Sequence, residues 1–397
     1  MRLMKLRSVA AVVLAVLMLG FACWGIVPAP TFSLLPLAVA VPEWAPRVLA
    51  FSLLLALLVR LLARGRARTI ATVLVLVAAA CVVWPTVAAP FARHAAERAL
   101  DEAHVPAAHT RTLSGVDVAR DLPVRLRDGS SLALDLFRPR DAADIPHGAA
   151  PPSNAVAQPS AARYAAAPFP LVVAIYGGAW AFGSRNAMAP LARHYAERGY
   201  AVAVVDYRHA PRYRFPVQRD DVDDALRAIA AHAREWHVDP RRVALLGRSA
   251  GAELALIAAE RPQPLGVAAV VALYAPIDLV GGWNEPPRPD PADVRGILET
   301  YVGGPPDAAH ASAYRAASPL DGAHRGMPPA LLICGARDEL VLIRFQRELA
   351  ARLRALGVPV VAIELPWANH AFDEVDGIGA SIAGDATLRF LDAKLGG

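Results

Sequence analysis

The chain has 397 residues, enough for one large domain or two ordinary ones, and its mean hydropathy of +0.34 suggests membrane segments. The net charge of +5 comes from the N-terminal quarter, because residues 1–98 hold ten of the 41 Lys and Arg residues but two of the 36 Asp and Glu residues. The remainder is mildly acidic, which argues against a folded domain that binds nucleic acid. The sequence has no P-loop motif and no His/Cys cluster with zinc spacing, and its three cysteines form no disulfide framework. We therefore expect no metal, no cofactor and no nucleic-acid partner.

Three apolar runs in the first hundred residues are candidate membrane spans. They cover residues 8–27, 48–63 and 69–89. The first and the last are of spanning length, and Arg60 near the end of the middle run could extend its side chain to the membrane interface. A shorter apolar run at 32–41 is broken by Pro36 and Pro42, which indicates an interfacial or re-entrant segment.

The basic residues beside these runs predict their orientation. Three precede the first run: Arg2, Lys5 and Arg7. Four lie near the end of the second run or between it and the third: Arg60, Arg64, Arg66 and Arg68. The loop between the first and second runs carries only Glu43 and Arg47. By the positive-inside rule, the N-terminus lies in the cytoplasm, and the chain emerges near Pro90 on the outer face of a bacterial cytoplasmic membrane. Two or four spans are alternatives, and so is a signal peptide cleaved at Ala-Val-Ala 38–40, which would leave two apolar runs unexplained.

Three regions follow from this reading: a membrane region at 1–90, a linker at 91–114 and a domain at 115–397. Residues 91–104 predict a short helix that joins membrane to domain. Two strand-like runs at 116–124 and 131–137 flank a hairpin-type turn, Arg-Asp-Gly-Ser. The Pro- and Ala-rich stretch at 139–168 has no periodicity, and we interpret it as a flexible surface loop.

Apolar strands then alternate with amphipathic helices. The predicted strands are 171–176, 201–207, 243–247, 267–275, 330–335 and 358–365, and the predicted helices are 187–198, 217–236, the stretch after Ser249, and 341–356. This alternation predicts an α/β fold with a mostly parallel sheet and helices on both faces. Residues 279–319 interrupt it with a segment rich in Pro, Gly, Trp and Asp. Insertions at the carboxyl ends of strands line the ligand crevice in such sheets, so we expect a small cap over the site.

Ser249 stands where a strand gives way to a helix, in Gly-Arg-Ser-Ala-Gly. Gly247 and Gly251 allow a sharp turn and close packing of helix on strand, which is the setting of a nucleophile elbow. A serine hydroxyl needs a base, and in this architecture the acid and then the histidine follow the serine along the chain. Asp338 follows the strand 330–335, and His370 is the only histidine after it. We therefore predict a catalytic triad of Ser249, Asp338 and His370, with Glu339 as the alternative acid.

The tetrahedral intermediate of acyl transfer also needs donors for its oxyanion. The sequence Tyr-Gly-Gly-Ala-Trp follows the strand 171–176, and its glycines allow backbone amides to approach a substrate oxygen. The predicted donors are the amides of Gly178, Ala179 and Ala250. Gly177 and Trp180 are candidate substrate-binding residues. Phe182 and Trp283 could also line an acyl pocket, although core packing or filling of the cap would explain these aromatic residues equally well.

In combination these motifs resemble the α/β-hydrolases of the hormone-sensitive-lipase and carboxylesterase type, and the Gly-Gly-Ala-Trp loop after apolar helices is also similar to prenylcysteine methylesterases. The matching motifs are Gly177–Trp180, Asp206–Arg208, Gly247–Gly251, Gly335–Leu340 and Asn369–Phe372. Tyr176 departs from the family's usual histidine and Ala179 from its third glycine, so Ala179 is expected to narrow the space for bulky alcohol groups. Three polar sites are expected to be structural: Asp206–Arg208 braces the glycine loop, Arg248 is solvated or salt-bridged, and Asp278 caps a helix.

The resemblance implies a serine hydrolase that cleaves a small-molecule or lipid ester through an acyl-enzyme on Ser249. The apolar runs at the N-terminus predict that this enzyme is membrane-anchored, with those helices in contact with membrane lipid. An amidase or formamidase with the same triad is an alternative. A non-catalytic binding protein that keeps the fold is another.

Overall fold

A computed structural model of the chain describes all residues except 1, 109–112, 114, 141–166 and 397. One eight-stranded sheet has the order β1-β2-β4-β3-β5-β6-β7-β8. The strands are β1 (Val116–Arg125), β2 (Ser131–Pro139), β3 (Phe169–Ile175), β4 (Ala201–Val205), β5 (Val238–Arg248), β6 (Val267–Leu273), β7 (Ala330–Gly335) and β8 (Val360–Leu365). β2 runs antiparallel to both of its neighbours, β1 and β4. The other neighbouring pairs, from β4 through β3, β5, β6 and β7 to β8, are parallel. The predicted α/β fold with a mostly parallel sheet is confirmed.

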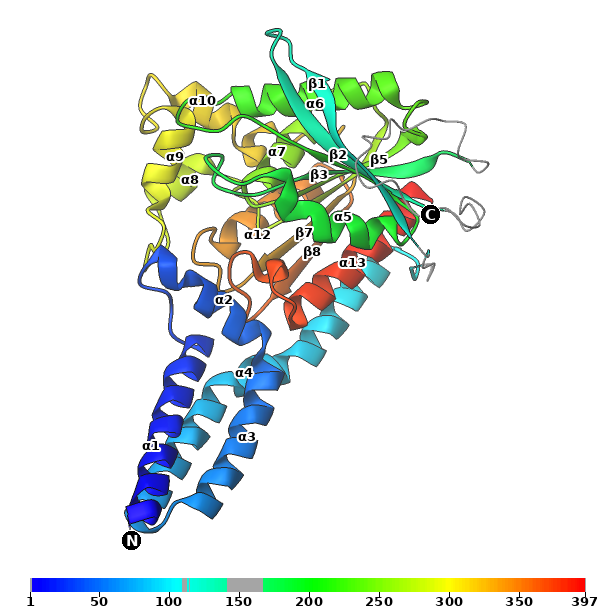
Figure 1. Cartoon of the computed structure of the whole chain (residues 1–397). Helices are drawn as coiled ribbons and strands as arrows, with labels where there is room; N and C mark the ends of the chain where they lie inside the picture. The colour runs from blue at the N-terminus through cyan, green and yellow to red at the C-terminus, as the bar shows by residue number, and fades with distance from the viewer. Residues whose placement is uncertain (1, 109–112, 114, 141–166, 397) are drawn as a thin grey trace.

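Helices cover both faces of this sheet (Figure 1). They are α5 (Ala189–Ala196), α6 (Val217–His232), α7 (Ala250–Ala259), α12 (Ile343–Ala355) and α13 (Ile378–Leu395). Every residue of β3 and β4 is buried, as expected of apolar, Val-rich strands that are covered on both faces. Every residue of α7 is buried as well, because this Ala-rich helix packs directly against β5 and β6.

The C-terminal helix α13 was not predicted from the sequence. Its apolar side chains Ile382, Ala386 and Phe390 recur every four residues, and all three are buried. This helical periodicity was a usable signal, although small and polar residues dilute it.

Four short helices follow β6 in the segment expected to form a cap: α8 (Leu279–Asn284), α9 (Val294–Val302), α10 (Ala311–Ala316) and α11 (Pro319–Gly322). The loop expected at 139–168 lies, from 141 to 166, outside the described residues.

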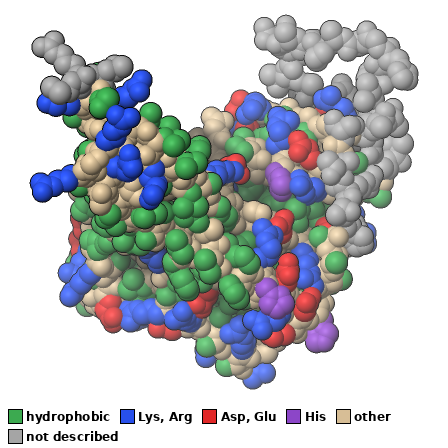
Figure 2. All heavy atoms as spheres, turned by 90° about the horizontal axis from the view of Figure 1, so that it is seen from below, with side chains coloured by type: hydrophobic (Ala, Val, Ile, Leu, Met, Phe, Trp, Pro, Cys, Tyr) green, Lys and Arg blue, Asp and Glu red, His purple; other side chains and the backbone are tan. Residues whose placement is uncertain are grey.

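Three N-terminal helices are long and apolar enough to cross a membrane, judged by length and composition alone. They are α1 (Arg2–Ala22), α3 (Ala45–Leu62) and α4 (Gly65–Glu102), which pack on one another and project from the domain that contains the sheet (Figure 1). The view toward their free end shows hydrophobic side chains and a group of Lys and Arg side chains (Figure 2). Among the described residues, every large hydrophobic side chain classed as exposed belongs to residues 4–91, except Phe182.

Two details of this region differ from expectation. The short helix expected over 91–104 is the end of α4, which continues through Pro90 to Glu102 without a break. The apolar run at 32–41 is not interrupted by Pro36, because this proline occupies the first turn of α2 (Leu35–Glu43), where its missing N–H costs no intrahelical hydrogen bond. A short 3₁₀ turn, η2 (Phe32–Leu34), precedes α2.

Candidate active site

Ser249 lies on a sharp turn between β5 and α7. Its backbone has φ 51° and ψ −123°, a conformation that L-residues rarely adopt, and its amide donates to the Leu273 carbonyl at 3.0 Å. A Cβ atom at position 247 would lie 2.1 Å from the Gly251 carbonyl oxygen. One at position 251 would lie 2.3 Å from two carbonyl oxygens at the end of β3. Both glycines are therefore required for the turn that presents the serine.

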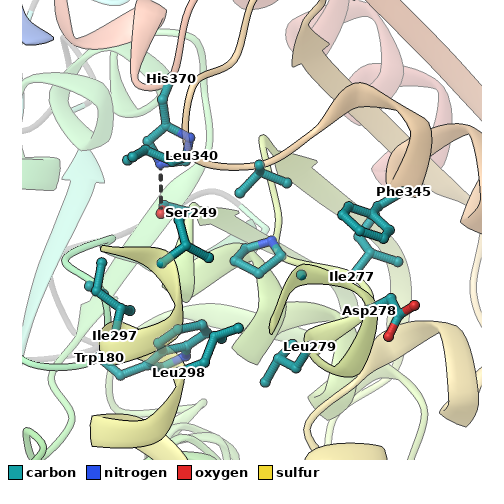
Figure 3. Close-up of a pocket in the computed structure, with 15 residues that line it drawn as sticks. Trp180, Ser249, Ile277, Asp278, Leu279, Ile297, Leu298, Leu340, Phe345 and His370 are labelled. Carbon is teal, nitrogen blue, oxygen red and sulfur yellow. Dashed lines mark hydrogen bonds between the residues drawn. The ribbon is translucent and has the colours of Figure 1, made fainter. Parts of the chain in front are cut away.

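The structure brings Ser249, His370 and Asp338 together at the carboxyl edge of the sheet. His370 Nε2 lies 2.9 Å from Ser249 Oγ (Figure 3). Its Nδ1 lies 2.9 Å from Asp338 Oδ2. Asp338 also accepts hydrogen bonds from the amides of Leu340 and Val341, at 2.8 and 2.7 Å, which fix the carboxylate. This arrangement can deprotonate a serine hydroxyl and hold the resulting imidazolium.

The alternative acid, Glu339, points elsewhere. Its carboxylate accepts from the Asn369 side-chain amide at 2.8 Å and from the backbone amide of Ala29 at 2.9 Å. Of the two adjacent acidic residues, Asp338 is therefore the one whose carboxylate can orient His370.

The loop after β3 comes close to the serine. A Cβ atom on Gly177 would lie 3.0 Å from Ser249 Cβ, and Ala179 lines the same pocket as Ser249. Gly178 has φ +134°, and a Cβ atom there would lie 2.0 Å from the Phe182 carbonyl oxygen. Within the described ranges, the backbone amides of Gly178, Ala179 and Ala250 donate to no protein acceptor. These three amides are therefore available as donors for a developing oxyanion.

Tyr176, the departure from the family's histidine, anchors this loop by its own contacts. Its hydroxyl donates to Asp206 at 2.5 Å and lies 3.0 Å from His209 Nε2, and its ring stacks on Tyr207 at 4.5 Å. The Tyr207 hydroxyl donates in turn to the Tyr176 carbonyl at 3.2 Å. Burial raises the pKa of the Tyr176 phenol well above its usual value, so the group stays a donor. Asp206 and Tyr207 thus brace the loop, as their sequence position indicated, whereas Arg208 is bound to Asp221 and Asp128 instead.

Trp180 fixes the other side of the loop. Its ring is buried and stacks on Tyr301 of α9 at 4.0 Å, and its Nε1 donates to Glu253 at 2.9 Å. Burial raises the pKa of Glu253 well above its usual value. Sequence reasoning missed Glu253, although it is the one charged residue in the apolar helix α7, and a lone charge at such a position was a usable signal.

Beside the serine lies an apolar pocket (Figure 3). Its walls carry mainly hydrophobic side chains from the cap and from the segment after β7, including Ile277, Leu279, Ile297, Leu298, Leu340 and Phe345. Trp180 contributes to the lining, whereas Phe182 and Trp283 do not. Trp283 instead donates to Glu299 inside the cap at 2.8 Å, and Asp278 accepts from the Gly281 amide as the N-cap of α8. In the described part of the chain, no group of three His, Cys, Asp or Glu side chains could hold a metal ion.

A buried ion pair contacts the loop that carries His370, residues 366–377 after β8. Arg248 lies 2.7 Å from Asp373, and the Tyr274 hydroxyl donates to the same carboxylate at 2.5 Å. The Tyr274 ring stands edge-on to the His370 ring with centroids 4.7 Å apart. Arg248 is therefore salt-bridged, one of the two structural roles expected of it. Sequence reasoning missed Asp373 and Tyr274, which no local motif distinguishes.

The chain is similar to a family model, to curated proteins and to solved structures. Residues 172–374 match a family model described as alpha/beta hydrolase fold. The chain is 33% identical to the probable carboxylic ester hydrolase LipM of Mycobacterium tuberculosis over 231 residues, which are 56% of this chain and 54% of that protein. It is also 33% identical to esterase LipC of the same organism over 240 residues, which are 57% of this chain and 58% of that protein. The chain thus spans just over half the length of these relatives. An esterase structure from Pyrobaculum calidifontis superposes with a TM-score of 0.56 at 23% identity, covering 78% of this chain and 94% of that one, which is a likeness of fold.

Proposed function

The chain belongs to the alpha/beta hydrolase fold family, and from that premise we propose that it is a membrane-anchored serine hydrolase that cleaves carboxylic esters through an acyl-enzyme on Ser249. The observation that carries the proposal is the line of contacts from Ser249 Oγ through His370 to Asp338, built on a strained elbow beside an apolar pocket. Similarity to proteins named as ester hydrolases supports it.

The geometry supports a two-step reaction. His370 Nε2 takes the hydroxyl proton as Ser249 Oγ attacks the ester carbonyl, and the amides of Gly178, Ala179 and Ala250 stabilise the oxyanion. The imidazolium, held by Asp338, then gives its proton to the departing alcohol, which leaves the acyl group on the serine. Water, deprotonated by the same histidine, attacks the acyl-enzyme and releases the acid.

The apolar lining of the pocket suits the hydrocarbon part of an ester. Leu298 of the cap is buried and Leu340, in the segment after β7, is partly buried, and neither side chain has a polar atom that would need a partner. A substrate that reaches this site from a lipid phase agrees with the three apolar helices that precede the domain.

Membrane anchoring is proposed on the distribution of exposed apolar side chains. A patch as extensive as the surface of α1, α3 and α4 is rare on soluble monomers and marks contact with lipid or with another protein. The arginines around the junction of α3 and α4 and the basic residues at the start of α1 support an orientation with those ends in the cytoplasm and the catalytic domain outside it.

The triad is tested on the full-length protein in detergent. Ser249→Ala and His370→Ala are each expected to lower ester turnover by several orders of magnitude, because either change removes the activated nucleophile. Asp338→Asn should reduce turnover by about 10⁴-fold, since an amide cannot hold the imidazole in the required tautomer. His232→Ala, which alters a histidine on α6 away from the site, is the matched control and should keep wild-type activity. A Ser249→Ala or His370→Ala variant that retained more than about a tenth of the activity would remove that residue from the triad.

Two further measurements separate the alternatives. Comparison of anilide with phenyl-ester turnover distinguishes an amidase from an esterase. A fluorophosphonate probe that failed to label Ser249 in the wild-type protein would favour a non-catalytic binding protein.

A further inference from the structure

The segment between the first two apolar helices connects α1 to α3 and also contacts the catalytic domain. We call residues 23–47 the docking segment; it comprises η1 (Cys23–Gly25), η2, α2 and the first residues of α3. Figure 1 shows α2 directly beneath the catalytic domain, and most of α2 is buried. The loops that it meets are the acid loop, residues 336–342 after β7, and the histidine loop, residues 366–377 after β8.

The docking segment binds the acid loop on both sides of Asp338. The Arg337 guanidinium donates to the Gly25 carbonyl at 2.5 Å and to the Ile26 carbonyl at 2.9 Å. The Glu339 carboxylate accepts from the Ala29 amide at 2.9 Å. These contacts join residues more than 300 positions apart in the chain.

The same segment binds the histidine loop through Glu43. Glu43 is 1% exposed, and its carboxylate accepts from Trp367 Nε1 of this loop at 3.0 Å and from the Gly379 amide, in the first turn of α13, at 2.5 Å. Trp367 stands three residues before His370. Burial raises the pKa of Glu43 to about 7. Burying this carboxyl group costs free energy, which its two hydrogen bonds offset.

The two loops are also tied to each other. The Glu339 amide donates to Asn369 Oδ1 at 2.9 Å, while Asn369 Nδ2 donates to the Glu339 carboxylate at 2.8 Å. The His370 amide donates to the same Asn369 oxygen at 2.7 Å. A continuous set of hydrogen bonds therefore runs from the docking segment through Glu339 and Asn369 to the backbone of the histidine.

We propose that the docking segment is part of the framework of the active site, with Glu43 and Glu339 as positioning residues that hold the histidine and acid loops where His370 meets Asp338. The inference rests on the proposed hydrolase function. A displacement of about 1 Å in a catalytic group can cost about 100-fold in rate. The membrane region then acts in catalysis as well as in anchoring.

The test compares Glu43→Ala and Glu339→Ala with the wild type as full-length proteins in the same detergent. Active sites are counted by fluorophosphonate labelling, so that kcat is expressed per reactive serine. We expect kcat per site to fall by about 10- to 100-fold in each variant while KM changes little, because neither Glu43 nor Glu339 lines the substrate pocket. Arg93→Ala is the matched control: it removes another contact of the N-terminal helices with the domain, to Asp385 and Ser381 on α13, and should leave kcat per site unchanged.

A role confined to stability would lower the number of labelled sites and the Tm but leave kcat per labelled site at the wild-type value, and that result would overturn the inference. If the alanine variants do not fold, Glu339→Gln takes their place. It keeps the volume but offers one acceptor oxygen to two donors, Ala29 N and Asn369 Nδ2, so wild-type kcat in this variant would equally overturn the inference. Failure of the proposed function itself would appear earlier and separately, as a wild-type protein that is neither labelled nor active.

Discussion

Replacing the proposed nucleophile by glycine should make the protein more stable than replacing it by alanine. Ser249 has φ +51° and ψ −123°, where any residue with a Cβ atom is strained. Ser249→Ala keeps this atom and therefore keeps the strain, whereas Ser249→Gly removes it. Both variants lack the hydroxyl, so the lost contact with His370 cancels in the comparison, and both should be inactive.

The expected difference follows from two opposing terms. A non-glycine residue in a sparsely populated backbone region costs about 1–3 kcal/mol. Glycine also gives the unfolded chain more conformational entropy than alanine does, which lowers the free energy of unfolding of the glycine variant by about 0.4–1 kcal/mol. The balance leaves Ser249→Gly more stable by about 1 kcal/mol, or about 2 °C in Tm for a domain of this size.

The assay is thermal unfolding of both variants in the same detergent. Ser381 provides the matched pair, because it lies inside α13 with helical geometry, where glycine should be less stable than alanine by about 0.5–1 kcal/mol. The order of the two variants should thus reverse between positions 249 and 381. If Ser249→Gly unfolded at or below the temperature of Ser249→Ala, the elbow would not be strained as described.

Three further predictions concern orientation, specificity and pH. A reporter active only outside the cytoplasm should be active when fused after residue 104 and silent when fused at residue 66; the reverse pattern would put the domain in the cytoplasm. Ala179→Gly should raise kcat/KM for tert-butyl acetate relative to n-propyl acetate by about 10- to 200-fold, because a methyl group leaves the pocket wall, and an unchanged ratio would assign the size limit to the cap. Burial raises the pKa of Glu260 from 4.5 to about 8, so its contribution to stability is complete below pH 4.5 and is lost as the pH rises toward 8. Glu260→Gln should therefore gain Tm over the wild type as pH increases from 5 to 8, and parallel Tm curves would contradict this.

Features encoded by neighbouring residues were predictable from the sequence. Hydrophobic periodicity predicted the alternation of strands and helices and the apolar N-terminal helices, since burial on one or both faces leaves a local pattern. The glycines around Ser249 predicted the turn, because only a residue without a Cβ atom fits where the helix approaches the strand. Chain order then selected Asp338 and His370, which the structure places in contact with each other, with His370 also against the serine.

Contacts between distant residues required the tertiary structure. Asp338 and Glu339 are adjacent and chemically alike, and only the direction of each side chain in the folded loop decides that one meets His370 while the other meets Ala29. The burial of Arg248 against Asp373 and the docking of Glu43 beside Trp367 likewise leave no local pattern. The physical reason is that backbone propensity and burial periodicity act over a few residues, whereas these partners are 125 and 324 positions apart and meet only through the order of the strands and the packing of the N-terminal helices on them.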